Sequence, residues 1–479
     1  MAARWKALVG LLVALAGTAG TSSAVAADSA PGDWYLSADR VAAVRDELPT
    51  SLTPVRVAVL DSGIDGGHPA LAGSIVGAQS FVGGDPLVDT SGHGTFVAGE
   101  IVALAAAADA SSPAPVQLLI AKITNGGSIE PGAEARAIYW AVANGARVIN
   151  LSLGGLRDPN STNRDTYSPV EAAAVRYAVA HRVVVVAAIG NGDEAPTQPW
   201  PFASWPAALP HVIGVSALAP DGSVPVWSDR DARFNELAAP GTQIVSTFPR
   251  SLTALDAGCP DQGYSDCAPP EYRSAAGTSF AAPQVSAAAA LLLAVNPHLM
   301  PDQVSWLLER NADDSNPATG CGGCAIGRDP LTGWGTLDVA KAVAALSGPL
   351  PPANRYEPTN DAGGQARPLV ASHATIVGDL DYWENPLDVY RVRLGPGAQL
   401  WVRLTASSGG TTLALWKPGT AHIDANAPLS RREQLIAHSG AASTKTLHYR
   451  SFRGGWYYLE VAVRAHANAR YRLSYAAVH

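Results

Sequence analysis

Cysteine, methionine and charged residues are all scarce in this chain of 479 residues. Charged residues make up only 15% of the sequence, against about 25% in an average globular domain. Hydrophobic residues nevertheless reach 47%, which argues against disorder as the dominant state, because disordered chains are poor in apolar residues and rich in charge. At about 100–200 residues per domain, the length predicts two or three domains.

Basic residues are also few, and their number and distribution indicate whether the chain could bind nucleic acid. Lysine and arginine number 33 against 41 acidic residues, which gives a net charge of −8. No segment gathers the basic residues into a patch, so the sequence argues against nucleic-acid binding as a main function. The acidic balance indicates solubility rather than a particular partner.

Long apolar runs are missing, and the first short apolar run is explained by export of the chain, not by a membrane span. Two basic residues precede the apolar stretch 8–16, and small residues follow at 23–26. This order is typical of a secretory signal peptide, so we expect a signal at 1–26 with cleavage after Ala26. The stretch is too short to cross a membrane, and polar residues interrupt the next most apolar run, 281–295. The sequence therefore predicts a secreted protein, extracellular or at the cell surface, without a membrane span.

The cysteines number only four, at Cys259, Cys267, Cys321 and Cys324. In an exported chain an even number suggests disulfides, and four cysteines allow three connectivities. Proximity favours the pairs Cys259–Cys267 and Cys321–Cys324, and reduced thiols are the alternative. A zinc site is disfavoured, because Cys259 and Cys267 have the wrong spacing for a ligand pair. We therefore expect no metal site.

Alternating strand and helix patterns between residues 55 and 346 predict an α/β domain. The expected strands are 57–60, 117–123, 148–151 and 183–188, and the expected helices are 134–145 and 168–182. Continuous apolar strands separated by helices indicate a parallel sheet covered by helices on both faces. In such sheets the ligand site lies at the carboxyl ends of the strands.

The pattern changes on either side of this domain. Residues 27–54 are expected to be an N-terminal extension, with a short helix within 34–48. The proline-rich run 347–352 predicts a stiff linker. Residues 353–479 lose the helical period and predict a small all-β sandwich domain. Its expected strands are 387–394, 399–405, 411–416, 446–452, 456–463 and 471–475.

Three motifs offer a carboxylate, an imidazole and a hydroxyl that could act together. Asp61 ends the first apolar strand, His93 stands between two glycines at the start of an apolar helix, and Ser279 precedes a long Ala/Leu helix. A serine hydroxyl is a weak nucleophile that needs a base, and the base needs an orienting carboxylate. Each residue alone has an ordinary explanation, as a turn residue, a packed histidine or a helix cap. The three together predict nucleophilic catalysis.

These motifs resemble those of the subtilisin-like serine peptidases, the subtilase family, over about residues 55–346. The order Asp, His, Ser along the chain is the one known for subtilisin. The catalytic residues implied by the resemblance are Asp61, His93 and Ser279, with Asn191 as the oxyanion-hole donor. The implied substrate-binding residues, on a strand edge that walls the first specificity pocket, are Asn150, Ser152, Leu153, Gly154 and Gly155.

The resemblance implies a secreted serine endopeptidase that hydrolyses peptide bonds in a protein or peptide substrate and needs no cofactor. We expect a monomer. The stretch 105–115 lacks the Asn/Asp loop with which many relatives bind calcium, so the sequence does not support a structural calcium. The extension before Asp61 is too short for the pro-domain common in the family, and in this it resembles the mycosin branch. That branch has a C-terminal membrane helix, which we do not find here.

Other interpretations stay open beside this one. A protein exported only for binding would need a broken catalytic position, and all four of Asp61, His93, Ser279 and Asn191 are intact. An esterase with the same triad would not need a strand edge suited to an extended peptide, so the edge at 153–155 argues against it. Residues 353–479 resemble, more weakly, the prepeptidase C-terminal type of β-sandwich. Asp65 and His68 are interpreted as structural. The aromatic residues that follow Asn191 either line a pocket or pack within their loop: Trp200, Phe202 and Trp205.

Overall fold

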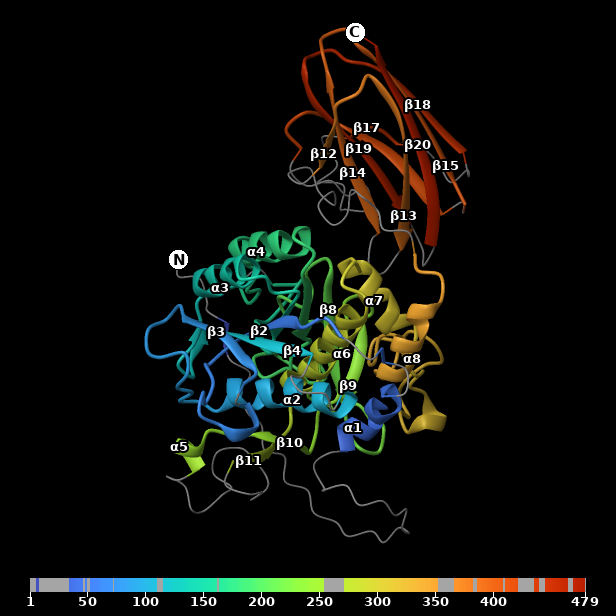
Figure 1. The fold of residues 1–479 in the computed structure, drawn as a ribbon. Helices are drawn as coiled ribbons and strands as arrows, with labels where there is room; N and C mark the ends of the chain where they lie inside the picture. Colours follow the sequence, from blue (N-terminus) through green and yellow to red (C-terminus); the bar gives the residue numbers. More distant parts are fainter. Residues whose placement is uncertain are drawn as a thin grey trace. The chain divides into compact units, whose positions relative to one another are not determined.

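The computed structural model divides into two compact units, 1–350 and 351–479, which are described separately here (Figure 1). The residues that the structure describes are 6–7, 34–45, 48–49, 52–71, 73–109, 115–161, 163–253, 271–351, 366–381, 386–407, 410–420, 435–438, 444–463 and 468–478. Of the predicted signal peptide they include only β1 (Lys6–Ala7), which pairs with β5 (Ser128–Ile129).

The first unit is built on a seven-stranded sheet in which all neighbouring strands are parallel. The strand order is β3-β4-β2-β6-β7-β8-β9. The bounds are β2 Val55–Asp61, β3 Ile75–Ser80, β4 Val116–Lys122, β6 Val148–Leu151, β7 Val184–Ala188, β8 Val212–Leu218 and β9 Leu237–Pro240. The inner strands β6, β7 and β8 are buried along their whole length, as expected when helices cover both faces of a sheet.

Successive residues of each inner strand point into two different cores. In β2, Val57 and Val59 join one hydrophobic cluster, while Ala58 and Leu60 join the other. The first cluster includes residues of α2 His93–Ala108, α6 Ala282–Val295, α7 Pro301–Arg310 and α8 Val339–Ala344. The second includes residues of α3 Pro131–Ala143 and α4 Pro169–Ala180. The predicted α/β fold class is therefore confirmed.

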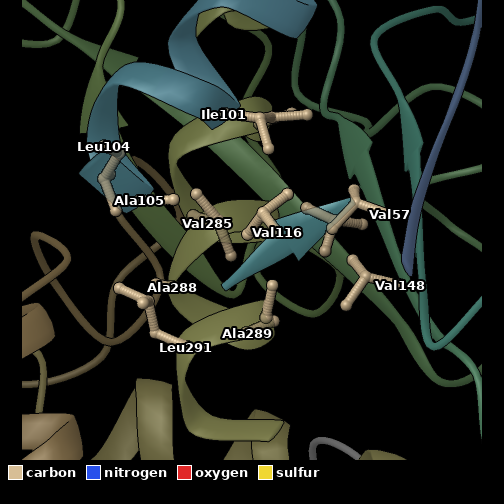
Figure 2. Close-up of a cluster of buried hydrophobic side chains, with 14 of the residues drawn as sticks. Val57, Ile101, Leu104, Ala105, Val116, Val148, Val285, Ala288, Ala289 and Leu291 are labelled. Carbon is tan, nitrogen blue, oxygen red and sulfur yellow. The ribbon is translucent and has the colours of Figure 1, made fainter. Parts of the chain in front are cut away.

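The core under α2 and α6 combines many alanine side chains with larger valine, leucine, isoleucine and phenylalanine side chains. Figure 2 shows Ile101 and Leu104 of α2 beside Val285 of α6, with Val57 and Val148 of the sheet reaching the same cluster. In the part of the chain that the structure describes, one helical stretch, Thr278–Val295, is long and apolar enough to cross a membrane. That stretch is 94% buried inside the protein, so its apolar surface is already covered.

Short elements complete the first unit. The extension forms two short helices, α1 (Trp34–Ala38) and η1 (Val41–Val44), where the sequence predicted one, and their apolar side chains join the first cluster. The indole N–H of Trp34 donates to the carbonyl of Thr242 over 3.0 Å. The remaining elements are η2 Pro69–Leu71, β10 Ile244–Thr247, α5 Arg250–Thr253, β11 Tyr272–Ala275, η3 Thr278–Phe280, η4 Pro317–Thr319 and η5 Ala345–Ser347.

The second unit is a sandwich of two sheets, with strand orders β12-β14-β19-β16-β17 and β13-β20-β15-β18. All its pairs are antiparallel except β12 with β14. The bounds are β12 Arg367–Leu369, β13 His373–Asp381, β14 Leu387–Leu394, β15 Gln399–Ala406, β16 Thr411–Trp416, β17 Leu435–His438, β18 Thr444–Arg450, β19 Gly455–Val463 and β20 Asn468–Val478. The all-β part of the predicted fold class is thus confirmed, although three of these strands were not predicted: β12, β13 and β17.

Candidate active site

Asp61 and His93 meet where a strand ends and a helix begins. Asp61 is the last residue of β2, and His93 is the first residue of α2. The Nδ1 atom of His93 lies 2.9 Å from both carboxylate oxygens of Asp61, and both side chains are buried. A Cβ at Gly94 would lie 2.2 Å from the carbonyl oxygen of Gly63, so only glycine allows the helix to start this close to the strand. The structure therefore brings the predicted carboxylate and imidazole into contact.

Asp89 holds the start of α2 in place, a role that the sequence analysis missed. Its Oδ1 accepts hydrogen bonds from the Ser62 hydroxyl (2.8 Å) and from the N–H of Gly92 (2.9 Å). Its Oδ2 accepts from both the N–H (2.9 Å) and the hydroxyl (2.7 Å) of Thr95. These bonds occupy N–H groups at the beginning of the helix, which would otherwise lack partners.

The surroundings of His93 favour its protonated form. Burial alone would lower the pKa of the imidazole. The charge of Asp61 and the hydrogen bond to it, together with the charge of Asp89, instead raise the pKa of His93 above its usual value. The imidazole is thus a stronger base than a free histidine.

Ser279 lies in η3, one turn before α6, rather than within the long helix itself. Its hydroxyl donates to the carbonyl of Ser152 over 3.2 Å, and the Ser152 hydroxyl donates back to the carbonyl of Ser279 over 2.6 Å. The Nε2 atom of His93 is buried and, among the described residues, has no hydrogen-bond partner. The ring of the next residue, Phe280, lies 5.4 Å from the imidazole, so the serine segment is close to His93 although no Ser279–His93 hydrogen bond is formed.

Asn191 follows β7 and is fixed by the serine segment. Its Oδ1 accepts hydrogen bonds from the N–H (3.0 Å) and the hydroxyl (2.8 Å) of Thr278. Because the oxygen is engaged in this way, the amide Nδ2 is left as a donor. A Cβ at Gly277 would lie 3.4 Å from that Nδ2, so the amide faces the backbone just before Ser279. Thr278, which the sequence analysis did not single out, sets this orientation.

The five predicted substrate-binding residues divide into two groups. The side chains of Asn150 and Ser152 are buried and hydrogen-bonded to each other over 2.9 Å, and Leu153 is buried in the second cluster. Their side chains serve packing, and only their backbone could meet a substrate. Gly154 and Gly155, by contrast, line a surface pocket.

This pocket is open to solvent, and Asn191 is one of the residues that line it. Its other polar side chains are Asp193, Glu194, Ser204 and Asp229, none of which the sequence analysis assigned to the site. Asp193 and Glu194 stand just after Asn191 in the sequence, so their position was a usable signal. Asp229 comes from a distant loop, and no motif marks it.

The other residues singled out in the sequence have structural partners. The His68 ring is buried against the carbonyl of Glu271 (3.0 Å), and Asp65 forms an ion pair with Arg250 (3.4 Å). Trp200 donates to the carbonyl of Arg157. None of the three aromatic residues after Asn191 is among the residues lining the pocket: Trp200, Phe202 and Trp205.

The structure describes only one of the two predicted cysteine pairs. The sulfur atoms of Cys321 and Cys324 lie at disulfide distance, and their Cα atoms are 5.3 Å apart. Cys259 and Cys267 lie outside the described residues. Within the described ranges, no three His, Cys, Asp or Glu side chains are grouped so that they could hold a metal ion.

Comparison with known proteins identifies a family and relatives that this chain resembles. The profile of the subtilase family, peptidase S8, matches residues 53–330, which is more than half of the chain. Subtilisin DY of Bacillus licheniformis is 35% identical over 261 residues, covering 54% of this chain and 83% of that protein. Fervidolysin of Fervidobacterium pennivorans is 32% identical over 327 residues, covering 62% of this chain and 41% of that protein.

A similar structure has also been solved. The crystal structure of a lanthipeptide protease matches with a TM-score of 0.52 and covers 66% of this chain and 95% of its own. At 24% sequence identity, this likeness concerns the fold alone.

Proposed function

Since the chain belongs to the subtilase family, and is a subtilisin-like serine endopeptidase, we propose that Asp61, His93 and Ser279 are its catalytic triad. The observation that carries the proposal is the contact between Asp61 and His93. Both carboxylate oxygens engage Nδ1, which leaves the buried Nε2 without a partner among the described residues. A buried polar atom without a partner is costly and calls for a functional explanation, and a base waiting for the proton of Ser279 provides one.

In the proposed reaction, Ser279 Oγ attacks the carbonyl carbon of the scissile peptide bond while His93 Nε2 takes the hydroxyl proton. His93 then gives this proton to the leaving amine, and water hydrolyses the acyl-enzyme by the same route. Asp61 keeps the proton on Nδ1 and stabilises the imidazolium that forms.

Attack requires the Ser279 hydroxyl to leave the carbonyl of Ser152, and a rotation about its Cα–Cβ bond is sufficient for this. A peptide extended along the edge at 152–155 would offer its own N–H to the carbonyl of Ser152. Binding of substrate would then release the hydroxyl toward His93.

The negative charge of the tetrahedral intermediate needs donors that are in place beforehand. We assign this role to the Nδ2 of Asn191 and to the backbone N–H of Ser279. The two bonds from Thr278 to Asn191 Oδ1 support the assignment, because they hold the amide with its nitrogen free to donate.

We further propose an organisation of five parts: a secretion signal at 1–26, an extension at 27–54, the peptidase domain at 55–346, a linker at 347–352 and a β-sandwich of the prepeptidase C-terminal type at 353–479. The enzyme acts as a monomer on a protein or peptide, outside the cell or at its surface. The reaction needs no cofactor, because the chain itself supplies the nucleophile, the base and the oxyanion donors.

The test compares the wild-type chain with Ser279→Ala, and with the exposed Ser347→Ala as a matched control. We expect the wild type and Ser347→Ala to react with a fluorophosphonate probe and to cleave casein, and Ser279→Ala to do neither. A folded wild type that the probe does not label would be a binding protein. A labelled chain that hydrolyses esters but not casein would be an esterase, and undiminished turnover by Ser279→Ala would reject the assigned nucleophile.

A further inference from the structure

The pocket beside Asn191 combines three carboxyl groups with no basic side chain among the residues that line it. Asp193, Glu194 and Asp229 share this small space with Ser204, and glycine backbone forms much of the remaining wall. Like charges gathered in one place repel each other unless a cation joins them. The pocket therefore lacks a positive charge that a ligand could supply.

Asp229 is the most buried of the three carboxyl residues that line the pocket. Its side chain is buried, and its Oδ2 accepts a hydrogen bond from the Ser204 hydroxyl over 3.2 Å. A Cβ at Gly190 would lie 2.2 Å from this Oδ2, so the carboxyl group is in contact with the backbone that precedes Asn191. Its other oxygen, Oδ1, is buried and has no hydrogen-bond partner among the described residues. An acceptor in this state is available for a donor from outside the chain.

Asp193 and Glu194 stand at the exposed mouth of the same pocket. Partial desolvation, and then the charge of Glu194, raise the pKa of Asp193 to about 6. Burial, and then the charge of Asp193, raise the pKa of Asp229 well above its usual value. Ionisation of these carboxyls is thus hindered while the pocket is empty, and a bound cation would favour it.

The position of the pocket relative to Asn191 fixes which part of a substrate could enter. A substrate carbonyl held by Asn191 belongs to the residue on the acyl side of the scissile bond. The side chain of that residue is the nearest to the pocket, which Gly154 and Gly155 border on the proposed substrate edge.

We propose that the pocket selects lysine or arginine on the acyl side of the scissile bond, with Asp229 at its base and Asp193 and Glu194 at its mouth. The inference rests on the proposed function, because it takes Asn191 as the oxyanion donor. A lysine or arginine side chain carries its charge at the end of a long apolar stem, which suits a pocket with glycine walls and an acidic base.

The experiment uses the full-length chain and peptide substrates that differ only in the residue before the cut. Lysine is compared with norleucine, which has a similar shape without the charge, and arginine with citrulline. A hydrogen bond to a charged group corresponds to about ten- to a hundredfold in binding, so we expect kcat/KM for lysine over norleucine to differ by about that factor. Because each comparison is a ratio within one enzyme, the titration of His93 cancels.

Variants link the preference to the pocket. Asp229→Asn keeps the shape of the side chain but cannot ionise when a cationic side chain binds, and we expect the lysine-to-norleucine ratio to fall at least about tenfold. Asp193→Asn, at the exposed mouth, should lower the ratio less, and it serves as the test if Asp229→Asn does not fold. Asp221→Asn, in an exposed turn outside the pocket, is the control and should leave the ratio unchanged.

The ratio should also depend on pH with a definite sign. As the pH falls below about 6, Asp193 takes up a proton, and the attraction for a cationic side chain weakens. The lysine-to-norleucine ratio should therefore grow as the pH rises through this value, and Asp193→Asn should flatten the change.

The outcomes separate this inference from the proposed function. A wild type that is labelled by fluorophosphonate but cleaves norleucine as well as lysine overturns the charge preference and leaves the serine peptidase in place. A lysine preference that survives in both Asp229→Asn and Asp193→Asn also overturns the inference, because another site must then be responsible. A folded chain that is not labelled and cleaves no peptide overturns both proposals.

Discussion

The Nδ1 of His93 lies equally close, at 2.9 Å, to both carboxylate oxygens of Asp61. The contact joins the last residue of a buried strand to the first residue of a buried helix, so the core holds the backbone of both residues in place. This rigidity fixes which nitrogen of the imidazole carries the proton and leaves the other one to act as a base.

The first prediction concerns the pH dependence of peptide cleavage. The proposed base must be neutral, and the charges of Asp61 and Asp89 raise the pKa of His93 above its usual value of about 6.5. Activity should therefore be low at pH 5 and rise with a midpoint above about 6.5, because His93 loses its proton over that range. The measurement is kcat/KM against pH with a neutral substrate, and a flat profile between pH 5 and 8 would contradict the role of His93.

Asp89→Asn tests whether the hydrogen bonds of Asp89 hold the start of α2, and with it the contact between Asp61 and His93. Each oxygen of Asp89 accepts at least two hydrogen bonds. In Asp89→Asn, an NH₂ group replaces one of these oxygens, and because it cannot accept hydrogen bonds, two donors lose their partner. We expect the free energy of unfolding to fall by about 1–3 kcal/mol, measured by denaturant titration. Loss of the negative charge should also lower the pKa of His93, which would move the acid limb of the pH profile to lower pH.

The control for this prediction is Asp85→Asn, in the same loop. Asp85 accepts one local hydrogen bond, from the N–H of Leu87, and its side chain is exposed. This variant should change neither the stability nor the acid limb appreciably. If Asp89→Asn behaved in the same way, Asp89 would not be the support that its contacts suggest.

Asp39→Asn tests a buried carboxyl between the N-terminal extension and the core. Neither carboxylate oxygen of Asp39 has a hydrogen-bond partner among the described residues, and burial, and then the charge of Asp338, raise its pKa well above the usual value. Glu100, also buried, has a pKa raised by burial and, to a lesser extent, by the charge of Asp39. Asp39 therefore stays protonated in the folded chain at pH values where the unfolded chain releases the proton.

The sign of the effect follows from this difference. Because the folded state holds the proton more tightly, the contribution of Asp39 to stability is lost as the pH rises above about 4, by at most about 1.4 kcal/mol per pH unit. Asp39→Asn does not titrate, so the variant should gain stability relative to the wild type as the pH rises above about 4. Denaturant unfolding at several pH values measures the gap, and parallel curves for the two proteins would show that Asp39 is already ionised when folded.

The sequence predicted β7, whose residues are continuously apolar, and β6, in which Asn150 is the single polar residue. It missed β8, in which Gly214 and Ser216 interrupt the apolar run although both are buried. It also missed β12, which contains Pro368, and β13, whose alternation is weak. Burial in the final fold, rather than local pattern, decides these strands.

The site was predictable only where a motif marks it. Asp61 and His93 lie in motifs, and the structure brings them together; the triad and the oxyanion role of Asn191 stay predictions. Asp229 could not be found in the sequence, because the fold of a distant loop alone carries it beneath Gly190.

The last prediction concerns a chain that ends at Gly348. The final helix of the first unit, α8, buries Val339, Ala342 and Val343 in the first cluster, so nearly all of the core lies before the linker, although the shortened chain loses Leu350, which packs against that cluster. All the proposed catalytic residues lie in this unit. We therefore expect the shortened chain to fold and to keep kcat/KM on a short peptide within about twofold of the full-length value, because interfaces between such domains are modest.

A large protein substrate should respond differently to the same truncation. If the β-sandwich supplies binding energy at a distance from the cut, its removal should lower kcat/KM on the protein substrate and not on the peptide. Both chains are compared on both substrates, and thermal unfolding scans show whether the shortened chain is folded. A shortened chain that is folded yet inactive on the short peptide would make the β-sandwich part of the catalytic unit, and the proposed boundary at 347–352 would then be wrong.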